Sequence, residues 1–293
     1  MCIFTHERNN YLNIYKNGIR NDGRNFNKCR SLNIILGPKG GFNEIQQGNT
    51  RVVVSSFIQP TYCSPKGDSD FVFSFEIKMP RNKKYKSIEY PQKNCHDNCI
   101  YINEIVRLLN SIYNNEKYSF FKTTHVFTDN IHLVVKFKIF IIEDHGNIKD
   151  VIIAGISISL YTLKEYAYII NGQILNVNSN YDHLSNLKCT ICSFPLSFSF
   201  GIIETWEGEF LIIFDPNDYE ENLSISIITI VLTFNDKLIC IFSGVGPGSD
   251  ENIIKEAIRI SLTRNNGIKN TLRDILNIKT TNDLVNEISF IIQ

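Results

Sequence analysis

Alternating hydrophobic and polar positions predict a sheet in the first part of the chain. The segment GFNEIQQGNTRVVVSSF, residues 41–57, has two extended runs divided by Gly48-Asn49, a dipeptide suited to a tight hairpin turn. A further strand is predicted at the end of the segment from Gly18 to Gly37, and three more are predicted over residues 70–79, 125–130 and 131–142. Apolar residues recur at helical spacing over residues 100–115, which predicts an amphipathic helix with Ile102, Ile105, Val106, Leu109 and Ile112 inward and Asn103, Arg107, Asn110 and Asn114 outward.

The turn Asp144, His145, Gly146 and Asn147 separates the last of these strands from a second apolar run, DVIIAGISISLYTL. Local propensity favours a strand for this run, because Ile and Val dominate it. Asp150 as an N-cap and a close-packing face at Ala154-Gly155 favour a helix, which we expect here. A strand–turn–helix junction often presents backbone N–H groups to a phosphate.

The second half repeats the order of strands followed by a helix. Four apolar runs, ICSFPLSFSFGII, EFLIIFD, SISIITIVLTF and KLICIFSG, predict four strands. A helix is expected from Ser249 and Asp250, with Asp250 and Glu251 at its first turn, where the helix dipole favours acids. A short last helix is expected at residues 283–290. The polar stretch at 175–186 marks a domain boundary, which gives a leader (1–17), a first domain (18–186) and a second domain (187–293) of an α+β duplication.

Composition limits the class of protein without identifying it. The 293 residues carry a formal net charge of +0, with 43% hydrophobic residues, which is enough for a sizeable core. Neutral charge argues against a general nucleic-acid coat but allows a local basic patch. The start MCIFTHERNN lacks the hydrophobic region of a secretory signal, and no run is apolar enough to span a bilayer. We therefore expect an intracellular soluble protein with reduced thiols and no membrane partner.

The order of several short motifs resembles the RNase PH family. GIRNDGR before a strand, followed by IQQGNTRVVVSS, is similar to the N-terminal signature of that family, and FGIIETWEGEFLIIFDPNDYEEN is similar to its second-domain hairpin and acidic turn. Each motif is weak alone, and their shared order carries the resemblance, over roughly residues 14–265. The Asp-Gly-Asn-type turn at Asp144, His145, Gly146 and Asn147 resembles the non-catalytic ring subunits of the RNA exosome within this family.

The resemblance implies a fold, partners and a location. It implies two βαβα-type halves, the first like ribosomal protein S5 domain 2, and a six-membered ring around a pore. The implied partners are other RNase PH-like ring subunits, exosome cap proteins, an associated nuclease and RNA. The implied location is the nucleus, including the nucleolus, and the cytoplasm.

Active members of the family place a small hydroxyl residue and an Arg at the strand-to-helix turn, because phosphorolysis must bring two anions together. Here the matching positions are Asp144, His145, Gly146 and Asn147, and a carboxylate would repel phosphate. Active members also carry two acidic residues a short way apart after the second-domain hairpin. This chain keeps Asp215, Asp218, Glu220 and Glu221, but the expected position of the second acid falls in Ile225-Ser226-Ile227, which has none. The prediction is a degenerate phosphate site without catalytic residues. The alternative is that His145 acts as a proton shuttle beside Asp144.

RNA contact is predicted at a basic loop and a helix. Cations spaced along RNKKYK can neutralise backbone phosphates without reading sequence, and Arg107 matches an RNA-contacting arginine of ring relatives; the candidates are Arg81, Lys83, Lys84, Lys86 and Arg107. A solvated charged loop is the plain alternative. Arg20, Arg24 and Arg30 are expected to pair with Asp22 or a neighbouring subunit rather than with RNA.

The sulfurs do not predict a metal site. Cys189 and Cys192 form a CxxC at the start of a strand, where alternation points them to opposite faces, and Cys95, His96 and Cys99 give three ligands at best. No nucleotide-binding glycine motif occurs, so no cofactor or metal is expected.

Taken together, the predicted function is a non-catalytic structural subunit of the exosome ring. An active phosphate-dependent 3′ exoribonuclease is the alternative, as is another inactive ring position.

Overall fold

The computed structural model describes residues 5–16, 18–37, 40–61, 71–79, 94–114, 132–163, 168–171, 174–177, 194–243, 250–281 and 288–292. The first half contains the strands β1 (Leu32–Leu36), β2 (Phe42–Gln47), β3 (Thr50–Thr61), β4 (Phe71–Lys78) and β5 (His132–Glu143). Its helices are α2 (Asn94–Tyr113) and α3 (Ile148–Thr162). A separate two-stranded ribbon follows, made of β6 (Tyr168–Asn171) and β7 (Ile174–Val177).

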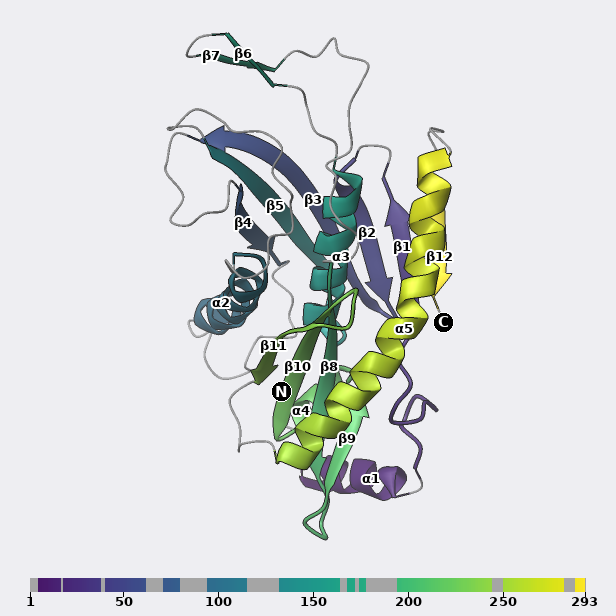
Figure 1. Cartoon of the computed structure of the whole chain (residues 1–293). Coiled ribbons are helices and arrows are strands. Elements are labelled where there is room, and N and C mark those ends of the chain that lie inside the picture. Colours follow the sequence, from purple (N-terminus) through teal and green to yellow (C-terminus); the bar gives the residue numbers. More distant parts are fainter. Residues whose placement is uncertain are drawn as a thin grey trace.

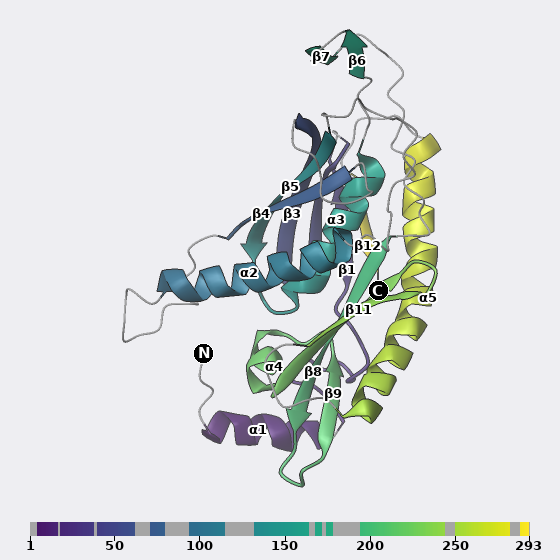
Figure 2. The same ribbon diagram turned by 60° about the vertical axis from the view of Figure 1, so that its left-hand side comes forward.

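The second half contains β8 (Pro195–Glu204), β9 (Phe210–Phe214), α4 (Asp218–Leu223), β10 (Ser226–Thr233), β11 (Leu238–Ser243) and α5 (Glu251–Thr281). Its four-stranded sheet has the order β11-β10-β8-β9. The six-stranded sheet has the order β12-β1-β2-β3-β5-β4, so β12 (Ile288–Ile292) returns from the end of the second half and pairs antiparallel with β1. Figures 1 and 2 show the two sheets at opposite ends of the molecule, with α5 running beside both.

Helix α3 joins the two halves because it is apolar almost all round. It packs against β2 and β3 on one side and against β8 on the other. A helix enclosed in this way buries its Ile and Val residues despite their strand propensity, because tertiary packing outweighs local preference. Gly155 is needed for the close approach to the first sheet, since a Cβ there would lie 2.7 Å from Val54 Cγ2. The predicted helix is confirmed.

Most predicted elements within the described residues are confirmed, and the hairpin at Gly48-Asn49 has Gln47 opposite Thr50. The strand predicted at residues 125–130 lies outside the described residues. The predicted inward stripe of α2 is also largely right, with Ile105, Leu108, Leu109, Ile112 and Tyr113 buried and Arg107 exposed. This side of α2 packs against β4 and β11.

Two predictions were wrong, the N-cap of α3 and the last part of the final helix. Asp150 is not the N-cap of α3; Asn147 is, and Asp150 lies within the first turn. The expected last helix at residues 283–290 is wrong in its last part, because Ile288–Ile292 adds a strand to the open edge of β1. The polar stretch at 175–186 begins with strand β7, and its remaining residues lie outside the described part. The leader contains helix α1 (Thr5–Tyr15), which buries Leu12 and Tyr15 against Ile203, Ile213 and Leu223.

Candidate functional site

The predicted phosphate turn connects β5 to α3 and lies against the second half. Gly146 and Asn147 have left-handed backbones, with φ of 88° and 56°. A Cβ on Gly146 would lie 2.4 Å from the carbonyl carbon of Asn217 and 2.5 Å from the nitrogen of Asp218, so only glycine fits. The Asp218 N–H also donates to the His145 carbonyl at 3.2 Å. The turn therefore forms part of the interface between the two halves.

The backbone donors of the turn are already bonded within the protein. The N–H of His145 donates to Thr50 Oγ1 at 3.2 Å, and that of Gly146 donates to Asp144 Oδ1 at 3.1 Å. The N–H of Asn147 donates to Glu221 Oε1 at 2.7 Å. A phosphate bound by these three groups would have to displace a hydroxyl and two carboxylates, which the fold holds in place.

Three acidic side chains surround the N-terminus of α3, the end of the helix dipole that attracts anions. Asp144 is buried within the turn. Glu221, on α4, accepts the N–H of Asn147 in the same turn. Burial raises the pKa of the Glu221 carboxyl to about 7, against the lowering effect of the Asn147 N–H and with a further increase from Asp144. Asp150 accepts the N–H and the hydroxyl of Ser199, each at 2.8 Å, and burial raises its pKa as well. Protein carboxyls thus occupy the space around this helix end.

An arginine and a hydroxyl do converge on the turn, although they come from elsewhere in the sequence. Arg30 donates to the carbonyls of His145 and Gly146, each at 3.0 Å, and the Thr50 hydroxyl donates to the Gly146 carbonyl at 2.8 Å. Both groups hold the turn through its carbonyl oxygens. The sequence prediction missed this pair because it looked for both groups within the turn; of the two residues, only Thr50 lies in the N-terminal signature described above.

Asp215, which follows β9, is the centre of the ion network between the halves. Its fully buried carboxylate accepts from Arg24 at 2.9 Å, from the backbone and side chain of Arg30 at 2.7–3.0 Å, and from Asn147 Nδ2 at 2.7 Å. Burial alone would raise the pKa of this carboxyl, but the guanidiniums of Arg30 and Arg24 outweigh burial and hold the pKa below its ordinary value. Asp215 is therefore ionised and fully engaged in structural contacts.

The three arginines pair within the chain. Arg20 is 1% exposed and forms an ion pair with Glu220, while Arg24 pairs with Asp22 and Asp215. The expected pairing with Asp22 is thus confirmed for Arg24. Glu220 also closes a capping box with Asn217 at the start of α4. The sequence Asn217-Asp218-Tyr219-Glu220 carries this signature, which could have predicted the helix.

The RNA candidates are only partly placed. Arg107 is exposed on α2. Arg81, Lys83, Lys84 and Lys86 lie outside the described residues. Lys78, just before them, pairs with Glu76 at 3.0 Å and lies 5.7 Å from the centre of the Phe140 ring.

The two cysteine-containing clusters considered as metal sites cannot be compared with the structure. Cys189 and Cys192 lie outside the described residues, as do the side chains of Cys95, His96 and Cys99. Within the described ranges, no three potential metal ligands come together. In the same part of the chain, no helix has the length and apolar character needed to cross a membrane.

Comparisons by sequence found neither a matching family model nor a matching curated protein. Solved structures do match. A chain of the Archaeoglobus fulgidus exosome with RNA bound to the active site has a TM-score of 0.61 and 18% identity, covering 90% of this chain and 97% of that one.

Two further structures agree. An archaeal exosome core chain gives a TM-score of 0.60 at 18% identity over 91% and 96% of the two chains. Rice (Oryza sativa) Rrp46 has a TM-score of 0.55 and 19% identity, covering 88% of this chain and 100% of that one. The chain has the α+β fold of the RNase PH-like subunits of exosome cores.

Proposed function

We propose that this chain is a non-catalytic structural subunit of an RNA exosome core ring, where it supports 3′-to-5′ RNA processing and decay. The support for a ring subunit is the fold, since nearly the full length of several exosome core chains superposes on this one. In this role it binds neighbouring ring subunits, cap proteins and an associated nuclease, and lines the path of the RNA.

One contact supports the absence of phosphorolysis. The Asn147 N–H, at the start of α3, donates to the Glu221 carboxylate at 2.7 Å, and Asp144 and Asp150 lie close by. An enzyme of this reaction class needs cationic and N–H donors directed at two phosphate groups. Here Arg30 and Thr50 are bound to the turn carbonyls and Asp215 instead.

A phosphorolysis assay tests this part of the proposal. Purified chain is incubated with single-stranded RNA and inorganic phosphate, with a bacterial RNase PH as positive control, and nucleoside diphosphates are measured. We expect none above background, both for the chain and for a His145→Ala variant. Diphosphates that form with the unchanged chain and disappear with His145→Ala would establish the active exoribonuclease instead.

The ring position is a finer proposal. The segments CSFPLSFSFGII and LIIFDPNDYEE, residues 192–203 and 211–221, most resemble exosome component 9, also called ribosomal-RNA-processing protein 45. An inactive position of the component 7 or 8 type is the alternative. Cross-links mapped on the native complex identify the two ring neighbours, and neighbours other than those of component 9 would reject this assignment.

Imaging of the tagged chain in the nucleus, nucleolus and cytoplasm tests its location.

A further inference from the structure

A cavity of roughly 260 Å³ lies between the two halves, and Arg30 and Asp150, which lie beside the phosphate turn, are among the residues that line it. Helix α3, strand β8 and helix α5 form most of its wall. Aromatic and aliphatic side chains line it over most of its length, namely Tyr161, Phe194, Phe198, Phe214, Phe234 and Ile158. At the packing density of protein interiors, about 0.75, this space suits a molecule of roughly ten to fifteen non-hydrogen atoms.

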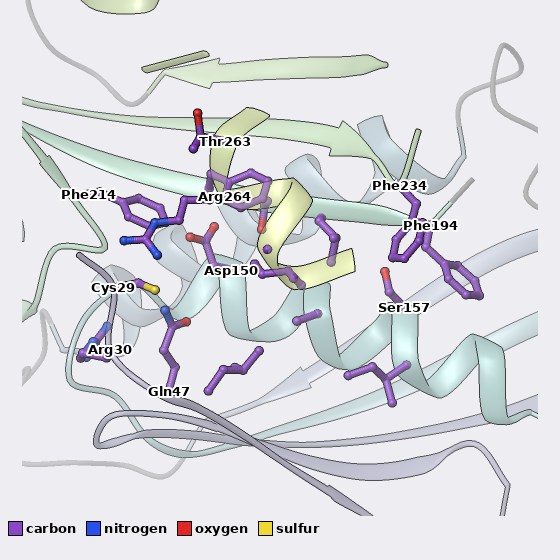
Figure 3. Close-up of a pocket in the computed structure, with 18 of the residues that line it drawn as sticks. Cys29, Arg30, Gln47, Asp150, Ser157, Phe194, Phe214, Phe234, Thr263 and Arg264 are labelled. Carbon is purple, nitrogen blue, oxygen red and sulfur yellow. The ribbon is translucent and has the colours of Figure 1, made fainter. Parts of the chain in front are cut away.

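The cavity has two chemically different ends. Figure 3 shows Arg264, Cys29, Gln47 and Asp150 together at one end, and Ser157 with Phe194 and Phe234 at the other. One end therefore offers charged and hydrogen-bonding groups, whereas the other is aromatic. This asymmetry fits a ligand with a polar head and an apolar body.

Arg264 differs from the other arginines of this region. Arg20, Arg24 and Arg30 each pair with a carboxylate. Arg264 donates to the Asn27 carbonyl at 2.7 Å and lies 5.9 Å from the centre of the Phe214 ring, and no carboxylate in the described ranges forms an ion pair with it. A half-buried guanidinium with remaining N–H donors and no acidic partner is suited to a carboxylate ligand.

The Asp150 carboxyl, which lies at the same end of the cavity, is bonded to Ser199 and forms no ion pair with Arg264. Both of its oxygens accept hydrogen bonds from Ser199, and burial raises the pKa of its carboxyl. These oxygens are therefore already bonded within the protein.

Gly267 leaves the α5 side of the cavity open. It lines the cavity from within a long helix, where glycine is about 1 kcal/mol less favourable than alanine. A Cβ at this position would meet nothing within 4 Å. A side chain at this position of the cavity wall therefore has room at its Cβ.

We propose that this cavity binds a small monocarboxylic acid with an apolar body, whose carboxylate pairs with Arg264 and whose body fills the aromatic end. The inference is independent of the ring function. It predicts that the apolar body is needed for binding and that the carboxylate strengthens it, because the other cation of the wall, Arg30, is already paired with Asp215.

Isothermal titration of the full chain with octanoate, octanol and acetate tests the proposal. We expect saturable octanoate binding at one site, about tenfold weaker octanol binding, and no detectable acetate binding. Arg264→Gln should lower octanoate affinity to that of octanol and leave octanol unchanged. Gly267→Leu, which adds a side chain to the cavity wall, should weaken both. The matched control Arg259→Gln, an exposed arginine on the same helix, should change neither.

Circular dichroism confirms that each variant is folded, and Arg264→Gln remains informative should Gly267→Leu fail to fold. No saturable octanoate binding by the unchanged chain would overturn the proposal. So would octanoate binding that both variants leave unaffected, or octanol binding as tight as that of octanoate.

Discussion

At the scale of single residues, Gly146 combines a left-handed backbone with a backbone contact across the two halves. Gly208 has a similar φ of 78° but open space around it. A substitution there therefore measures the cost of the left-handed backbone alone, without a steric clash. We predict that Gly208→Ala costs about 1 kcal/mol of unfolding free energy. Gly146→Ala should cost at least about 3 kcal/mol, because the two halves must separate to admit the methyl group. Urea denaturation measures both values; equal losses would show that the close contact is not needed.

Glu221 gives the fold a pH dependence. Its folded pKa of about 7 lies above the ordinary 4.5, so folding favours the protonated form. This contribution is complete below about pH 4.5 and is lost as the pH rises through about 7. We predict that Glu221→Gln, which keeps an oxygen for the Asn147 N–H, is more stable than the unchanged chain by about 1 to 3 kcal/mol near pH 8.

The same variant should show little gain at about pH 3, well below the ordinary pKa of 4.5, where Glu221 is protonated in both the folded and the unfolded state. Chemical denaturation at both pH values checks the difference. Parallel stability profiles for the two proteins would mean that Glu221 ionises normally in the folded chain.

The residue pattern predicted the turn but not the groups that hold it. Gly146 and Asn147 are turn formers in any context, so their role can be read locally. Arg30 and Asp215 are 185 positions apart, and Asn147 and Glu221 are 74 apart. The packing of the second half on the first brings these pairs together. Ion pairs of this kind leave no local sequence pattern.

At the scale of elements, helix α4 is too short to be stable alone and depends on its cap. Asn217 Oδ1 accepts the N–H groups of Tyr219 and Glu220 at 3.0 and 2.9 Å. We predict that Asn217→Ala lowers the unfolding free energy by about 1 to 2 kcal/mol. The matched control Asn222→Ala, on an exposed position of the same helix, should stay within about 0.5 kcal/mol. Equal effects of the two substitutions would show that the cap does not stabilise α4.

Elements with long, regular patterns were predictable, and elements fixed by their neighbours were not. Helix α2 and the β2–β3 hairpin follow from periodicity and turn chemistry alone. The run ISFII at β12 is short and apolar, which fits a helix or a strand equally well, and the open edge of β1 decides for a strand. Helix α1 has few apolar residues, and it is placed by the packing of Leu12 and Tyr15 in a cluster with Ile203, Ile213 and Leu223.

At the scale of the whole molecule, the proposed ring function places α2 near RNA. We predict that Arg107→Ala, in the assembled complex, lowers affinity for single-stranded RNA about threefold to tenfold. It should also lower the slope of log affinity against log salt by about 0.7, the value for one phosphate contact. Fluorescence anisotropy at several salt concentrations measures both. Arg259→Ala is the control, and equal effects at both positions would argue against a specific contact at α2.

The pairing of β12 with β1 also has a consequence for biosynthesis. About 250 residues separate Leu36 from its partner Ile288, and the ribosome adds roughly 5 to 20 residues per second. For on the order of 10 to 50 s, the emerging chain therefore presents the free edge of β1 to every other nascent chain nearby. Protection of that edge during translation, by a chaperone or by an assembling partner, is a requirement built into the order of the strands.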